Sequence, residues 1–426
     1  MIKKGFILLI FFAAFCSLWQ IVSFADQPLG LETLISEARA NNPDILAAKK
    51  RWEASKARIP QAKSLDNPTV ALEFEKIPRG TFQLNNVMPE DRMLSIAQMF
   101  PLFGKLSLKG KIAVVESQMN ASEYKAKELE VVNEVKNAYY DLFMNYKEIE
   151  LNKESRALLE AIAKSVEAKY SVGEMSQEEV YKLHSEIARL NNRILNLEQE
   201  KSSLKTRLNA LLSREAESPL GMPDLPEDVS FNKDIRALYE LTLLNQPELI
   251  IFSYAIEKNK FAKSLAKRSL FPDLMSELTL RGITSGMTGS WDLMLALSVP
   301  FWFWTKQRYE IKEAVYNLEE AEAAYTAMKN KAFSETKDLY TKIEIARNKL
   351  KLSKSDLMPI LEGSIGVSLT AFRSGKGDFM ALLDTQRMLV ENKMDYYRAL
   401  VEYHMHLANL ERTVGISLTE DSEVRK

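Results

Sequence analysis

The sequence predicts a mainly α-helical protein with four short transmembrane β-strands, built as an internal twofold repeat. Three observations predict this fold class. Residues 106–169 and 306–368 carry apolar side chains three and four positions apart, as long helices do. Four short segments alternate apolar and polar side chains, as strands do. One set of motifs occurs twice, with a spacing of about 200 residues.

Composition narrows the class of protein further. The chain has 426 residues, of which 46% are hydrophobic and 27% are charged, with a formal net charge of -1. This balanced charge gives no electrostatic basis for binding nucleic acid, so we expect no nucleic-acid partner. Glycine and proline, at 15 and 14 residues, are scarce for this length, which favours long helices.

The first 25 residues predict a signal peptide that is removed by cleavage after Ala25. Two lysines form a basic start, and the apolar run over residues 6–18 is too short to span a membrane comfortably. Cys16 lies inside this segment, and Phe15 precedes it where a lipoprotein signal needs a small side chain. We therefore expect export without lipidation, and a mature chain with no disulfide, thiolate metal site or cysteine nucleophile.

Matching motifs in the two halves indicate an internal duplication. Their order is the same and their spacing is nearly constant, which chance does not readily produce. The matched pairs are Asn41-Asn42-Pro43-Asp44 with Asn245-Gln246-Pro247-Glu248, the segment Pro101 to Lys105 with Pro300 to Lys306, and Tyr170-Ser171-Val172-Gly173 with Phe372-Arg373-Ser374-Gly375. We therefore expect both halves to fold to the same plan.

The first repeat is expected over residues 26–217. Its predicted elements are a helix over 31–63 with a break at Pro43, strands at about 69–76 and 93–99, a helix over 106–169, a hairpin tip at about 171–176 and a helix over 177–212. In the first strand Val70, Leu72 and Phe74 share one face. Such an alternation is typical of a sheet with one apolar side.

The second repeat is expected over residues 235–418. Its predicted elements are strands at about 274–281 and 291–299, a helix over 306–368 with an interruption at Pro359, and a hairpin tip at about 373–378. Residues 218–234 hold three prolines and a glycine and predict a linker between the repeats. Residues 419–426 are expected to form a C-terminal tail.

Four strands with one apolar face cannot close a sheet in lipid by themselves. A sheet in lipid leaves no backbone edge unpaired, and barrels of the outer-membrane type have at least about eight strands. The chain is therefore expected to form an oligomer. Two copies would give about eight strands and a lumen nearly filled by side chains, whereas three give a shared barrel of about 12 strands. Because a conduit needs an open lumen, three copies are the favoured oligomer.

Aromatic residues lie at or just beyond the ends of the predicted strands. They are Trp291, Phe301, Trp302, Phe303 and Trp304. Aromatic side chains gather at membrane interfaces, so this placement indicates an aromatic girdle in contact with outer-membrane lipid. Burial in a soluble core is the alternative. Four consecutive aromatic residues cannot all face one core direction in a regular strand, and we therefore favour the girdle.

Two segments resemble a known family. Gln98-Met99-Phe100-Pro101-Leu102-Phe103-Gly104-Lys105 and the run from Tyr170 to Val180, together with the twofold helix-strand-strand-helix plan, are similar to the TolC family of outer-membrane efflux proteins (outer-membrane factors). The segment from Pro101 to Lys105 most resembles the branch that serves heavy-metal pumps of the resistance-nodulation-division (RND) type. The resemblance covers nearly the whole mature chain.

The resemblance implies a TolC-like homotrimer with a β-barrel in the outer membrane and an α-helical barrel extending into the periplasm. A periplasmic adaptor (membrane fusion) protein and an inner-membrane pump of the RND type would be its partners. The chain would be a passive duct for heavy-metal cations, not an enzyme, with no catalytic residue and no cofactor. Two alternatives stay open: a duct for drugs or for a type I secreted polypeptide, and a periplasmic coiled-coil scaffold without a channel.

Both hairpin tips carry turn-forming residues. Gly173 and Gly375 can adopt positive φ where the chain reverses. Ser176 begins a capping-box pattern, and Asp378 is a suitable N-cap. By themselves these residues indicate ordinary helical hairpins. The resemblance implies in addition that the tips line the periplasmic entrance and contact the adaptor, through Tyr170, Gly173, Ser176, Phe372, Gly375 and Asp378.

Asp384 matches a family position whose carboxylates ring the closed periplasmic entrance. Three copies near a symmetry axis would hold cations and repel one another, so adaptor contacts could bias opening. A second gate carboxylate of some relatives corresponds here to Ala381, and a double ring is therefore in doubt. For an aspartate on any helix, a solvated face is the alternative.

No pattern in the mature chain predicts a metal site. His404 and His406 are two residues apart on a predicted helix, so they point in different directions, and His184 is isolated. Scattered methionines are typical of apolar packing rather than copper binding; those near the second strand pair are Met275, Met287 and Met294. Phosphate loops, nucleophile elbows and metalloprotease motifs are also missing from the sequence.

Overall fold

The computed structural model describes residues 29–77, 79–80, 83–84, 87–88, 91–225, 231–282 and 289–418. The expected signal peptide with its cleavage site at Ala25, and the expected tail at 419–426, lie outside the described residues. The described chain is mainly helical with one four-stranded antiparallel sheet, which confirms the predicted fold class. No helix in these ranges combines the length and the apolar character needed to cross a membrane.

The chain forms two compact units. The sheet unit comprises Leu46–Lys127 and Leu243–Ala332. The tip unit comprises the described residues within 29–45, 128–242 and 333–418. Two long helices contribute residues to both units: α4 (Lys105–Ser171) and α8 (Gln307–Leu352).

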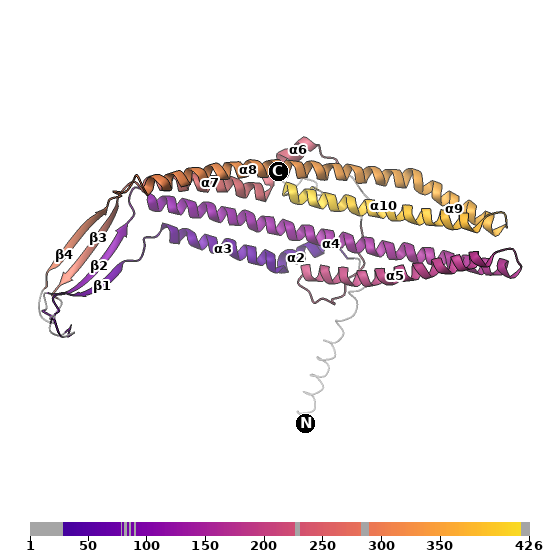
Figure 1. Ribbon diagram of the computed structural model, residues 1–426, viewed down its shortest axis with the longest axis horizontal. Coiled ribbons are helices and arrows are strands. Elements are labelled where there is room, and N and C mark those ends of the chain that lie inside the picture. The colour runs from indigo at the N-terminus through magenta and orange to yellow at the C-terminus, as the bar shows by residue number, and fades with distance from the viewer. Residues whose placement is uncertain are drawn as a thin grey trace, which may run out of the picture. The chain divides into compact units, whose positions relative to one another are not determined.

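The sheet unit holds all the strands of the described chain. They are β1 (Thr69–Phe74), β2 (Arg92–Phe100), β3 (Asp273–Arg281) and β4 (Trp291–Ser298). They pair in the order β1-β2-β3-β4, so the strands of the first repeat lie beside those of the second (Figure 1). β1 ends two residues before its predicted end, because the chain turns away near Lys76, whose φ is 52°.

Helices of both repeats lead into the sheet. They are α3 (Pro43–Lys63), α7 (Pro247–Arg268) and the first parts of α4 and α8. The Ser55 hydroxyl on α3 donates to the Ser117 hydroxyl on α4 at 3.2 Å. The Asn259 side chain on α7 donates to the Asn317 carbonyl on α8 at 3.2 Å. Each repeat therefore contributes a packed helix pair to this unit.

The tip unit is all-helical among its described residues, apart from one isolated β-bridge. It contains α2 (Leu31–Asn41), most of α6 (Ile235–Asn245), α5 (Gln177–Leu211), α9 (Met358–Arg373), α10 (Phe379–Val414) and the remaining parts of α4 and α8. Buried Tyr139 holds the segment between the repeats: its hydroxyl accepts from the Asp224 amide at 2.8 Å and lies 2.8 Å from the Leu29 carbonyl. Asp224 of the expected linker is thus held by α4, while Ser218 and Leu220 accept hydrogen bonds from α5.

Breaks in the helices follow the prolines. The Asn42 side-chain oxygen accepts from the amides of Asp44 and Ile45 at 2.9 Å and 3.3 Å, so it caps α3 where Pro43 predicted a break. Pro247 likewise begins α7 in the second repeat, although the side chain of Gln246 before it makes no capping hydrogen bond. Proline is well suited to the first helical position, because the amide that it lacks has no partner there.

The interruption predicted at Pro359 occurs one turn earlier. A π-helical turn, Ser353–Leu357, separates α8 from α9. Proline removes an amide donor, and its ring collides with the carbonyl four residues before it, which belongs here to Ser355. The disturbance therefore falls on the turn that precedes the proline.

Candidate functional site

The sheet has one face of large apolar side chains, and an opposite face on which polar and small side chains are mixed with methionines. Register places Val70, Ile96, Leu278 and Leu293 in one cross-strand row, and Leu72, Leu94, Leu280 and Trp291 in another row of the same face. A row of the opposite face holds Ala71, Ser95, Thr279 and Asp292. Such alternation suits a sheet with lipid on one side and water on the other.

The apolar face of the sheet is uncovered within one protomer. Leu72 is 71% exposed and Leu293 is 56% exposed, although protein surfaces seldom leave a contiguous patch of large apolar side chains in water. Among the described residues, β1 and β4 each leave one backbone edge without a neighbouring strand. This surface therefore requires further strands and an apolar environment.

All four strands meet helices at one end of the sheet. Because neighbouring strands are antiparallel, β1 and β3 begin where β2 and β4 end. We define the junction segments as residues 56–66, 101–112, 258–273 and 299–312, each of which joins a helix to a strand or lies beside that connection (Figure 1).

At this end the motif from Pro101 to Lys105 ties the first repeat to the second. The Lys105 ammonium donates to the Asp273 carboxylate at 2.9 Å and to the Phe271 carbonyl at 2.8 Å. The Leu102 amide donates to the same Asp273 oxygen at 3.1 Å. These bonds hold the turn between β2 and α4 against the start of β3.

The glycine of this motif has a steric role. Phe103 and Gly104 both have positive φ, 55° and 72°, a conformation that favours glycine. The Arg268 guanidinium donates to the Phe103 carbonyl at 2.5 Å, and a Cβ on Gly104 would collide with that guanidinium. The left-handed backbone therefore accounts for the glycine in this motif.

The predicted girdle residues are all exposed in the protomer. Phe301, Trp302, Phe303 and Trp304 form a turn after β4, and even the most covered of them, Trp304, is 50% exposed. Trp291 is also exposed, but it begins β4 and so stands at the opposite end of the sheet. The five aromatic side chains therefore lie outside the protomer's core and divide between the two ends of the strands.

Glycines and caps shape the two hairpin tips as the sequence indicated. Gly173 has φ 79° and Gly375 has φ 73°, where the chain reverses. Ser176 forms a capping box with Glu179 at the start of α5. The Asp378 carboxylate accepts from the Ala381 amide at 3.3 Å and caps α10. These contacts satisfy amides that a helix start leaves without partners.

Phe372 differs from its expected role at the tip surface. It is 2% exposed, and its ring lies 6.0 Å from that of Phe379 and 4.5 Å from the Lys169 ammonium. Together with residues of α4, α5 and α10 it forms the hydrophobic core of the tip. Phe372 therefore packs the two hairpins together, and its side chain is not available to a partner, whereas Tyr170 remains exposed.

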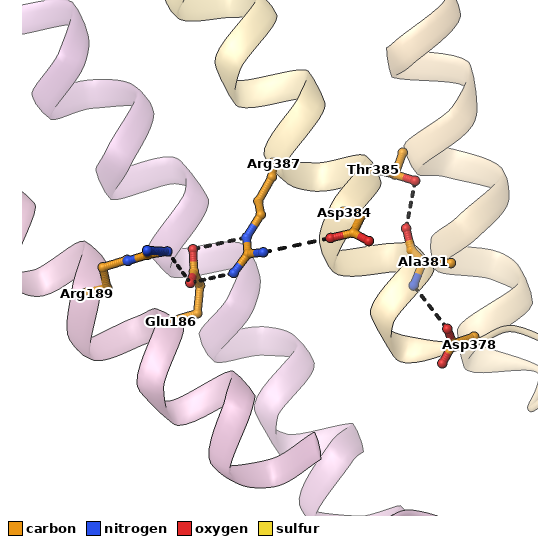
Figure 2. Close-up of polar contacts among 7 residues, drawn as sticks. All are labelled: Glu186, Arg189, Asp378, Ala381, Asp384, Thr385 and Arg387. Carbon is orange, nitrogen blue, oxygen red and sulfur yellow. Dashed lines mark hydrogen bonds and ion pairs between the residues drawn. The ribbon is translucent and has the colours of Figure 1, made fainter. Parts of the chain in front are cut away.

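Asp384 faces solvent beside an arginine that bridges two helices. Its side chain is 64% exposed, and its carboxylate lies 3.8 Å from the Arg387 guanidinium. The same guanidinium donates to Glu186 on α5 at 2.7 Å, and this hydrogen bond raises the pKa of Arg387. Figure 2 shows Arg387 between Glu186 and Asp384. Since Leu382 and Leu383 are buried, the helix directs Asp384 away from the tip core.

The roles of Asp273, Glu186 and Arg387 were not predicted from the sequence. Glu186 and Arg387 are 201 residues apart, and no local spacing connects them. Asp273 follows Pro272 and begins a strand at the end of the sheet that Lys105 also adjoins, so its acidic character and its place were visible in the sequence.

The described residues contain no group of three or more histidine, cysteine, aspartate or glutamate side chains that could hold a metal ion. His404 packs between aromatic rings, 5.3 Å from Tyr403 and 5.7 Å from Tyr140. Met275 and Met294 lie in β3 and β4, while Met287 lies outside the described residues.

Comparison with known sequences gives two matches. The family model described as "Outer membrane efflux protein" matches residues 34–214 and 238–416. The cobalt-zinc-cadmium resistance protein CzcC of Cupriavidus metallidurans is 20% identical over 404 residues, which cover 92% of this chain and 91% of that protein.

Solved structures share the fold at low sequence identity. The outer membrane protein VceC of Vibrio cholerae superposes with a TM-score of 0.78 at 15% identity, covering 91% of this chain and 96% of that one. CusC, described in terms of folding and transmembrane channel formation, gives a TM-score of 0.78 at 15% identity, covering 91% and 92%.

Proposed function

The chain belongs to the family of outer membrane efflux proteins, and from this premise we propose that it forms a passive homotrimeric duct through which a tripartite pump exports heavy-metal cations. It is an outer-membrane efflux channel that extends into the periplasm, and such channels act with an adaptor and an inner-membrane pump. The periplasmic scaffold without a channel is thereby set aside.

The main support for the duct is the sheet, which has two different faces and, among the described residues, unpaired edges on β1 and β4. An apolar face with exposed leucines suits lipid, and the opposite face, where threonine, serine, aspartate and glutamate lie among alanine and methionine side chains, suits an aqueous lumen. Because both outer edges of the sheet are free among the described residues, β4 of one copy can pair with β1 of the next. Three copies supply about twelve strands, enough for an open lumen.

The long helices supply the periplasmic part of this duct. α4 has 67 residues, which at about 1.5 Å per residue span about 100 Å. α4 packs against α5, where the Asn145 side chain donates to the Leu197 carbonyl at 3.1 Å, so one protomer contributes neighbouring helices to the proposed wall. The duct performs no chemistry in this proposal, because the inner-membrane pump supplies the energy.

The exposed hairpin tips are the proposed adaptor-contact surface. It comprises Tyr170, Gly173, Ser176, Gly375 and Asp378, and it leaves out the buried Phe372. Tyr170→Glu should weaken capture of the purified adaptor, while Tyr316→Glu, an exposed tyrosine of the sheet unit, should not. Equal capture by both variants would exclude the tip as the docking surface.

Asp384 is the proposed cation-holding residue of the entrance. Its contact with Arg387 is long and exposed, so solvent screens it and leaves the carboxylate able to bind a cation. Asp384→Asn should weaken cation block of single-channel current in a planar bilayer. Asp395→Asn is the control, because Asp395 pairs with Arg398 in the same i,i+3 arrangement on α10. Unchanged block in Asp384→Asn would remove the assignment.

We propose heavy-metal cations as the cargo because of the similarity to CzcC, whose name records resistance to cobalt, zinc and cadmium. The two chains match over nearly their full lengths. A deletion strain should lose resistance to one or more metals among cobalt, zinc, copper and silver, and should grow normally with dyes and detergents. Sensitivity to dyes and detergents alone would favour a drug duct. Recovery of the protein as a soluble periplasmic monomer would reject any duct.

A further inference from the structure

Positive charge is concentrated at the helix ends that adjoin the sheet. The four junction segments contain fourteen lysine and arginine residues but only three acidic residues, an excess of eleven positive charges in a chain whose formal net charge is -1. Ten of the fourteen cationic side chains are exposed. All four segments belong to the sheet unit, and the strand register places them at the same end of the sheet.

Helix stability accounts for only some of these charges. Lysines near the ends of α3 and α7 interact favourably with the negative end of a helix dipole. At the start of α4, however, Lys105 and Lys109 face the positive end, and the first turn there has no acidic residue. What the four segments share is their place beside the sheet, not their position within a helix.

Ion pairs within the protomer account for few of these charges. In the part of the chain that the structure describes, the junction cations paired with carboxylates are Lys105, with Asp273 at 2.9 Å, and Lys258, with Glu116 at 3.6 Å. Lys63, Lys109, Lys267 and Arg308 are all exposed. A single protomer therefore presents a cationic surface that it does not neutralise.

The cationic surface is continuous with the membrane-facing part of the sheet. The exposed aromatic turn from Phe301 to Trp304 lies within one junction segment, directly after β4. Aromatic side chains favour the level of lipid headgroups, and neighbouring lysine and arginine side chains can extend their charges to the same level. Phosphodiester headgroups carry the negative charge that such a surface lacks.

We propose that the junction segments form a cationic collar that binds anionic phospholipid headgroups in the periplasmic leaflet of the outer membrane. The collar rests on the proposed duct, because it requires the sheet to lie in the membrane. Through these contacts it fixes the depth of the sheet and selects the lipids that surround the protein.

Lipid selectivity can be measured by electron spin resonance on the mature full-length protein in phosphatidylcholine vesicles. Spin-labelled phosphatidylglycerol should associate on the order of fivefold more strongly than spin-labelled phosphatidylcholine, the preference that one lysine–headgroup contact supplies. Raising the salt from about 0.1 M to about 1 M shortens the screening length from about 10 Å to about 3 Å and should remove most of this preference.

A variant with Lys63→Gln, Lys109→Gln, Lys267→Gln and Arg308→Gln takes one exposed charge from each helix end. It should reduce the preference to about twofold or less while conducting ions normally. The matched control changes four exposed cations of the sheet unit outside the junction segments to glutamine, namely Lys49, Arg51, Lys125 and Lys331. The control should keep the wild-type preference.

Three results would overturn the collar. They are equal association of both lipids with the wild-type protein, a preference that high salt leaves unchanged, and a collar variant that keeps the preference. Altered ion selectivity with unchanged lipid preference would instead place these cations along the duct. Failure of the wild-type protein to insert into vesicles would reject the duct as well, which distinguishes the two proposals. The wild-type measurements decide the matter even if the fourfold variant does not fold.

Discussion

The hairpin tips and the sheet with its junction segments differ in how completely one protomer buries its apolar side chains and pairs its backbone groups. At the tips, glycines, caps and a buried core with Phe372 at its centre complete the fold within one chain. At the sheet, large apolar side chains are exposed and two strand edges are open among the described residues.

Charge differs between the two regions as well. Residues 160–186 and 356–387, which surround the tips, contain ten acidic and six basic residues, whereas the junction segments contain three and fourteen. The tips therefore hold within one chain the contacts that their fold needs, whereas the proposed duct completes the sheet only with other copies and with lipid.

Removing the centre of the tip core should have the largest effect on stability. Phe372→Ala should lower the free energy of tip opening by about 3–5 kcal/mol, because it deletes a fully buried ring. Amide hydrogen exchange in α9 and the start of α10 measures this change. Val172→Ala, at an exposed site of the same tip, should change it by less than about 0.5 kcal/mol. Similar effects of both variants would contradict a self-contained tip.

A charge on the apolar face of the sheet should leave the tips folded and prevent insertion. Leu278→Lys should cost about 2–4 kcal/mol per copy in lipid. Thr279→Lys, one residue away on the opposite face, should have little effect, because that face is proposed to meet water. Assembly into outer-membrane vesicles, followed by heat-modifiable gel mobility, measures insertion. The sheet would have the wrong face toward lipid if Thr279→Lys were the more damaging change.

The ion pair between Lys105 and Asp273, which joins the two repeats, should contribute less to stability than the tip core or the apolar face of the sheet. Lys105→Met leaves the Asp273 carboxylate with the Leu102 amide but without its ammonium partner, which should cost about 1.5–3 kcal/mol. Exchange of the Leu102 amide reports the loss directly. Lys109→Met, at an exposed site one turn along α4, serves as the control and should stay within about 0.5 kcal/mol. Equal protection in both variants would show that the repeats do not depend on this pair.

The smallest effect is expected at the capping box of α5. Ser176→Ala removes the side chain that accepts from the Glu179 amide and should destabilise the first turn of the helix by about 1 kcal/mol. Faster exchange confined to the first turn of α5 would match this expectation. Faster exchange throughout α10 would instead mean that the cap holds both hairpins, and that the tip is less modular than its core suggests.

Several features of the fold could be predicted because they depend on neighbours in the sequence. Alternation over Val70, Leu72 and Phe74 indicated β1, and Pro43 marked the break before α3. Asp378 was recognised as a cap because an N-cap bonds an amide within three residues. Pro359 predicted that the helix is interrupted but not where, because a proline disturbs the turn that precedes it.

The sequence by itself determined the helices, the strands, the twofold repeat and the resemblance to outer-membrane efflux proteins, because periodicity, capping and motifs act over short distances along the chain. Tertiary structure alone decided that Phe372 is buried, that Lys105 meets Asp273 and that Arg387 joins Glu186 to Asp384. It also brought four separate basic segments to one end of the sheet. The physical reason is that packing selects partners more than 150 residues apart, whose charges and volumes carry no local signal of each other.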